Sequence, residues 1–63
     1  MGGGEMNDSI IRAIFVEKYK LRQACVPVSK WRKRIAGEVL RFKIGTADEF
    51  VRCWEYLLKE KLL

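Results

Sequence analysis

Residues 45–58 read GTADEFVRCWEYLL, and this stretch decides the fold. Thr46 is followed three residues later by Glu49, which is the spacing of a capping box. In that motif the threonine oxygen accepts an N–H of the first helical turn, and the glutamate reaches back to the threonine N–H. The apolar residues that follow share one helical face; they are Phe50, Val51, Trp54, Leu57, Leu58 and Leu62. The pattern predicts an amphipathic helix over residues 46–62.

The segment before it, residues 29–43, predicts a second helix. We expect Ser29 to cap its start through the side-chain oxygen. We expect Gly45 to end it as the glycine that follows a helix C-cap. Its apolar stripe comprises Trp31, Ile35, Val39 and Phe42, with Ala36 and Leu40 beside them. Because Trp31 shares this stripe, we interpret it as a core residue in preference to a platform for base stacking.

A third helical pattern covers residues 8–23. Asn7, Asp8 or Ser9 is expected to cap it, and Pro27 requires the chain to leave the helix before it. Lys18 and Arg22 intrude on the apolar face, so we expect their stems to be buried and their charges to reach solvent. That face is formed by Ile10, Ile11, Ile14, Phe15 and Leu21.

The three patterns together predict an all-α fold, a compact three-helix bundle with helices at about 8–23, 29–43 and 46–62. Short connectors favour antiparallel neighbours, and no segment alternates with the period of a strand. A chain of 63 residues holds one domain at most. We expect residues 7–63 to form it, and residues 1–6 to be a flexible glycine-rich leader or a cloning scar.

The composition argues against an enzyme. The chain has no histidine, which removes Ser–His and Cys–His nucleophile pairs and the usual zinc sites. It has no phosphate-binding glycine loop, so we expect no metal, no cofactor and no small-molecule substrate. We interpret Cys25 and Cys53 as two reduced, half-buried thiols of an intracellular protein, cytoplasmic or nuclear, with a single intramolecular bridge as the alternative. No apolar run approaches the length of about 18 residues expected of a membrane span.

The positive charge is concentrated in one segment. Residues 29–44 contain six basic residues and one acid, an excess equal to the net charge of +5 for the whole chain. The outer side of this helix carries Lys30, Lys33, Arg34 and Arg41, with Gly37 among them. A glycine inside a helix costs about 1 kcal/mol relative to alanine. Either a phosphate backbone or a partner helix comes close at Gly37, or the glycine is tolerated drift or a crossing point within the bundle.

We therefore expect a small binding module that associates with nucleic acid. Lys30, Lys33, Arg34, Gly37 and Arg41 would contact the phosphate backbone, with help from Arg12, Lys20 or Arg22. A helix-turn-helix would instead place the start of the last helix in the major groove. That start carries Asp48 and Glu49, which phosphates repel, so we reject this docking.

Three other interpretations of the basic face stay open. It is also suited to an acidic protein partner, in a docking or dimerisation domain that binds a partner helix. The wide apolar arc of residues 46–63 favours such docking, or a homodimer, because a small core cannot bury all of it. Attachment to anionic lipid is a weaker hypothesis, since the apolar face is needed for the core. A basic face that is simply solvated is the plainest alternative.

Overall fold

The three predicted helices form, and they pack into an all-α bundle. The computed structural model describes residues 7–63, in which there is no strand. The helices are α1 (Asp8–Gln23), α2 (Trp31–Arg41) and α3 (Ala47–Lys59), and a single 3₁₀ turn (Val28–Lys30) precedes α2. The predicted bundle is therefore confirmed. The glycine-rich leader expected at residues 1–6 lies outside the described residues.

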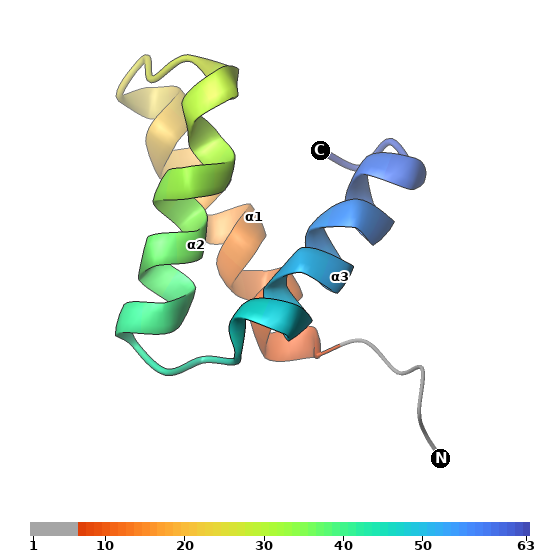
Figure 1. Cartoon of the computed structure of the whole chain (residues 1–63). Coiled ribbons are helices and arrows are strands. Elements are labelled where there is room, and N and C mark those ends of the chain that lie inside the picture. Colours follow the sequence, from red (N-terminus) through yellow and green to blue (C-terminus); the bar gives the residue numbers. More distant parts are fainter. Residues whose placement is uncertain (1–6) are drawn as a thin grey trace.

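Every helix contacts the other two. Figure 1 shows α1 and α2 side by side and running in opposite directions, whereas α3 begins beside the start of α1 and leads away from α2 at an angle. This arrangement leaves a groove on each side of α2, one shared with α1 and the other with α3.

Side chains cap the starts of α1 and α3. The Asn7 side chain accepts hydrogen bonds from the Ser9 and Ile10 backbone N–H groups, at 3.0 and 3.3 Å. The predicted capping box is present in α3, where the Glu49 N–H donates to Thr46 Oγ1 at 3.2 Å and the Thr46 N–H donates to Glu49 Oε1 at 3.0 Å. These bonds satisfy N–H groups that the first turn of a helix leaves without partners.

The predicted Ser29 cap of α2 is wrong. Residues 28–30 form the 3₁₀ turn, in which the Lys30 N–H donates to the Pro27 carbonyl at 2.9 Å and the Trp31 N–H donates to the Val28 carbonyl. A backbone carbonyl therefore accepts an N–H group that a side-chain cap at Ser29 would have accepted. The residue before α2 is Lys30, which makes no side-chain capping bond. The Trp31 indole N–H donates to the Val26 carbonyl at 2.9 Å and ties the connector to the helix start.

The end of α2 also differs from expectation. Lys43, not Gly45, adopts the left-handed conformation, with φ of 55°. Its N–H donates to the Leu40 carbonyl at 3.2 Å, and the Ile44 N–H donates to the Val39 carbonyl at 3.0 Å. These two bonds define a Schellman motif. The same motif ends α1 and α3, where the left-handed residues are Cys25 (φ 60°) and Lys61 (φ 59°).

The packing around Gly45 leaves no room for a side chain. A Cβ atom at this position would overlap Ile10 Cδ1 and would lie 3.0 Å from both Ile10 Cγ1 and Glu49 Oε1. Ile10 is fully buried, so its side chain has little room to move. The connector between α2 and α3 thus packs directly against the first turn of α1.

All three helices contribute to the core, which comprises Ile10, Ile14, Leu21, Trp31, Ile35, Val39, Phe50, Cys53, Trp54 and Leu57. The prediction that Trp31 is a core residue is therefore confirmed. Other predicted core positions are exposed: Phe15 (37%), Phe42 (61%), Leu58 (54%) and Leu62 (49%). Phe42 and Leu62 lie beyond the last helical turns. Phe15 and Leu58 lie at the edges of apolar arcs that are wider than the neighbouring helices cover.

The two cysteines and the intruding basic residues separate into buried and exposed members. Both thiols are free; Cys25 is exposed, whereas Cys53 is buried, with Sγ 3.9 Å from the Asn7 carbonyl oxygen. Lys18 is partly buried, and its ammonium lies 5.8 Å from the centre of the Phe15 ring, a cation–π distance. Arg22 is exposed. Across residues 7–63, no helix has the length and apolar character needed to cross a bilayer.

Candidate functional site

The outer face of α2 carries the predicted contact residues on the side opposite the buried stripe. Trp31, Ile35 and Val39 point into the core. Residues three and four positions apart lie on one face of a helix, and the basic residues follow that spacing on the other side. All five predicted contact positions are exposed: Lys30, Lys33, Arg34, Gly37 and Arg41.

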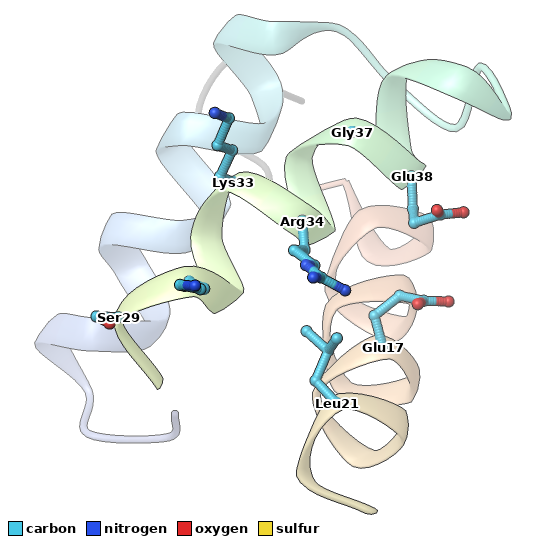
Figure 2. A pocket seen from close by; sticks show the side chains of 8 residues that line it. Glu17, Leu21, Ser29, Lys33, Arg34, Gly37 and Glu38 are labelled. Atoms are coloured by element: carbon cyan, nitrogen blue, oxygen red, sulfur yellow. The ribbon is translucent and has the colours of Figure 1, made fainter. Parts of the chain in front are cut away.

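Four of these five residues line one open groove between α1 and α2, with a volume of about 770 Å³. We call it the α1–α2 groove (Figure 2); it is lined by Glu17, Leu21, Ser29, Lys30, Lys33, Arg34, Gly37 and Glu38. The Arg34 side chain extends toward α1, where Glu17 and Leu21 lie, whereas Lys33 points away from α1. The predicted residues are therefore brought together, and α1 supplies a second wall.

Arg41 is the predicted residue that does not line the groove. Its guanidinium lies 3.7 Å from the Glu38 carboxylate, one helical turn earlier. It also lies 5.1 Å from the centre of the Phe42 ring, close enough for a cation–π contact. Arg41 is therefore already engaged within α2, and we assign it a smaller share of any contact with a ligand.

The charges that line the groove are of both signs. Glu17 and Glu38 are acidic, but each forms an ion pair with a basic residue that does not line the groove. The Lys20 Nζ atom lies 3.4 Å from Glu17 Oε2, and the Arg41 guanidinium lies 3.7 Å from Glu38 Oε2. Lys30, Lys33 and Arg34 have no ion-pair partner anywhere in residues 7–63. Three neighbouring side chains of the groove, Lys30, Lys33 and Arg34, thus carry positive charge that no ion pair within residues 7–63 neutralises.

Gly37 faces open space in the middle of this surface. No atom lies within 4 Å of the position that a Cβ would occupy. The hypothesis that another helix of the same bundle crosses at Gly37 is therefore wrong. Two interpretations stay: a ligand backbone approaches here, or the glycine is tolerated without a role.

The other basic residues considered for the site are dispersed over α1. Lys20 lies at the groove edge through its ion pair with Glu17. Arg22 lines a different hollow, which it shares with Cys25 and Trp31. Arg12 is exposed and does not line the groove. The lining of the α1–α2 groove thus comes from α2 and the turn before it, together with Glu17 and Leu21 of α1.

The contribution of α1 was missed by reasoning from the sequence. Glu17 and Leu21 are four residues apart and so share one side of α1, but the same is true of many pairs. Which side of α1 faces α2 depends on how the three helices pack. Glu38 was visible as the single acid of residues 29–44, yet its position on the groove wall could not be read from composition.

The α2 wall of the groove carries side chains of a kind that can bind anions. It offers ammonium and guanidinium donors on an open wall, and these groups bind phosphate oxygens by charge-assisted hydrogen bonds. Among residues 7–63, no three acidic or cysteine side chains cluster in a way that would hold a metal ion.

Comparison with known proteins gives no further assignment. The chain matches no protein-family model, and neither the curated proteins nor the solved structures include a significant match to it.

Proposed function

We propose that this protein binds the phosphate backbone of nucleic acid through the outer face of α2. The observation that carries the proposal is the set of three exposed cations, Lys30, Lys33 and Arg34, on one open groove without ion-pair partners among residues 7–63. The cations of this face add little to the stability of the fold, because like charges four residues apart, such as Lys30 and Arg34, repel one another. Phosphates would remove that repulsion.

The physical basis of binding would be the release of counterions from the nucleic acid. Each phosphate neutralised on a B-form duplex contributes about −0.9 to the slope of log K against log salt concentration, so three contacts give a slope of about −3. Such contacts position a protein but carry no sequence information. We therefore expect weak binding with little sequence preference.

Gly37 is consistent with a ligand that crosses the outer face of α2. Its missing side chain leaves the centre of the basic face bare, between Arg34 and Arg41 along the helix. A phosphodiester chain lying across α2 at this point would approach the backbone more closely than it would at any residue with a side chain.

The test is a binding titration with labelled DNA and RNA, single-stranded and double-stranded, followed by fluorescence anisotropy at several salt concentrations. The variant Arg34→Glu reverses one cation of the groove. The matched control is Arg52→Glu, which makes the same change of net charge at an exposed residue of α3 that does not line the groove. We expect Arg34→Glu to weaken binding and to reduce the salt slope by about 1 or more. Arg52→Glu should change both much less.

Two outcomes would overturn the proposal. If the unmodified protein does not bind at low salt, where non-specific electrostatic contacts are strongest, α2 is not a phosphate-binding face. If both variants weaken binding equally, the attraction comes from net charge and not from the groove. In the first case, the acidic protein partner becomes the better hypothesis for these cations.

A further inference from the structure

The other side of α2 carries a surface of different character. Between α2 and α3 lies a second open groove of about 430 Å³. We call it the α2–α3 groove; it is lined by Ser29, Arg32, Lys33, Ala36, Leu40, Ala47, Phe50 and Val51. Five of these eight residues are apolar, and the only charged ones are the two exposed cations Arg32 and Lys33.

The apolar surface continues from this groove along the outside of α3. Val51 lines the groove, and Leu58 follows it seven residues later on the same side of the helix. Leu40 on the α2 wall is 48% exposed, and Leu58 is 54% exposed. We call Leu40, Val51 and Leu58 together the apolar strip; a monomer leaves Leu40 and Leu58 in contact with water.

Acids border this strip on the side away from α2. Glu55 lies four residues after Val51, and Asp48 lies one turn before it; both are exposed, and neither has an ion-pair partner among residues 7–63. Arg52 and Lys59 lie further round α3. From α2 across the strip to the acids that border it on α3, the surface therefore changes from positive, through apolar, to negative, and the bases Arg52 and Lys59 follow beyond these acids.

A surface with this order of charges is complementary to itself. When two copies meet about a two-fold axis, each residue pair occurs twice, and the positive edge of one copy faces the negative edge of the other. A two-fold axis through the apolar strip, near Val51, would place Arg32 and Lys33 of each copy near Glu55 and Asp48 of its partner. We infer that the α2–α3 groove and the outer strip of α3 form a homodimer interface.

The size of the protein is consistent with this interface. Domains of this length commonly depend on disulfides, metals or oligomerisation, because one small core supplies little stability. Both thiols of this chain are free. Nine large apolar side chains are exposed in the described part of the chain, and burial of Leu40 and Leu58 in a dimer would remove two of them from water.

The experiment measures the mass of the full chain by sedimentation equilibrium over a concentration series, without nucleic acid, so its outcome is independent of the proposed function. We expect the mass to rise from that of one chain, 7.4 kDa, toward twice that value. Leu58→Glu should raise the dimer dissociation constant about tenfold or more, since a charge is placed in the apolar strip of the interface. Val16→Glu is the matched control, because Val16 is similarly exposed (47%) but lies on α1.

A charge exchange tests the orientation of the two copies. Arg32→Glu and Glu55→Arg should each weaken the dimer, and the double variant Arg32→Glu/Glu55→Arg should recover it, because the pair is restored with reversed sign. Circular dichroism and thermal unfolding of each variant show whether the fold is retained. A constant mass of one chain at every concentration would overturn the inference and leave the groove to an acidic helix of another protein. A dimer that Leu58→Glu and Val16→Glu affect equally would place the interface elsewhere.

Discussion

Gly37 and Gly45, the two glycines of residues 7–63, lie in opposite surroundings. At Gly45 an added Cβ would overlap the buried Ile10 side chain, whereas at Gly37 it would meet nothing within 4 Å. The packing of the bundle therefore explains Gly45 completely. It explains nothing about Gly37, nor about the unpaired cations around it. The corner between α2 and α3 is constrained by packing, whereas no packing contact among residues 7–63 constrains Gly37.

The largest change in stability expected from this contrast is that caused by the substitution Gly45→Ala. The new methyl group must displace Ile10, which is fully buried between the helices, and overpacking of this kind costs about 1–3 kcal/mol. We expect the free energy of unfolding, measured by urea denaturation, to fall by that amount. The φ angle at Gly45 is not in the left-handed region, so the loss would come from contact and not from backbone strain.

A second substitution separates contact from other causes. Ile10→Val removes the Cδ1 atom that the alanine would meet and by itself costs about 0.5–1.5 kcal/mol. The double variant Gly45→Ala/Ile10→Val should be more stable than the sum of the two single effects predicts. Strict additivity would mean that the two positions do not touch.

An intermediate effect is expected next to Gly45, at the cap of α3. Thr46→Ala removes the oxygen that accepts the Glu49 N–H and should cost about 1 kcal/mol of stability. Ser29→Ala is the matched comparison: a serine in the same kind of sequence position, but without a capping bond at the start of α2. Thermal unfolding should show a lower midpoint for Thr46→Ala and almost no change for Ser29→Ala. An equal loss in both variants would contradict the assignment of the α2 start.

The sequence predicted those features that depend on neighbouring residues. The capping box needs only Thr46 and Glu49, three residues apart, and its hydrogen bonds are present. Helical spacing likewise identified the three helices and the cationic side of α2. The cap at Ser29 was predicted wrongly because a 3₁₀ turn follows Pro27. Backbone bonds, among them that from the Lys30 N–H to the Pro27 carbonyl, form the start of α2, and the serine side chain makes no capping bond.

Features that depend on distant residues were beyond sequence reasoning. Glycine is the usual residue in the left-handed position after a helix, but Lys43 adopts that conformation after α2. At Gly45 a side chain is excluded instead by the Ile10 side chain of α1. In the same way, four of the five predicted site residues line one groove, but its second wall, with Glu17, depends on the face that α1 turns toward α2.

The smallest stability effect belongs to Gly37→Ala, and its direction is opposite to that at Gly45. Alanine is favoured over glycine in a helix interior by about 0.5–1 kcal/mol, and no atom obstructs the added methyl group. We expect the free energy of unfolding to rise by that amount. A fall would show that the space beside Gly37 is occupied.

The same variant sharpens the proposed function, because stability and binding should change in opposite directions. If a phosphodiester backbone passes close to Gly37, the methyl group will hold it away, and anisotropy titrations will show weaker binding by a more stable protein. Ser9→Ala is the control, since it changes an exposed position of α1 that does not line the groove; it should leave the affinity unchanged. If Gly37→Ala also leaves affinity unchanged, the phosphates are held by Lys30, Lys33 and Arg34 alone, and the glycine is a tolerated residue on a face selected only for its charge.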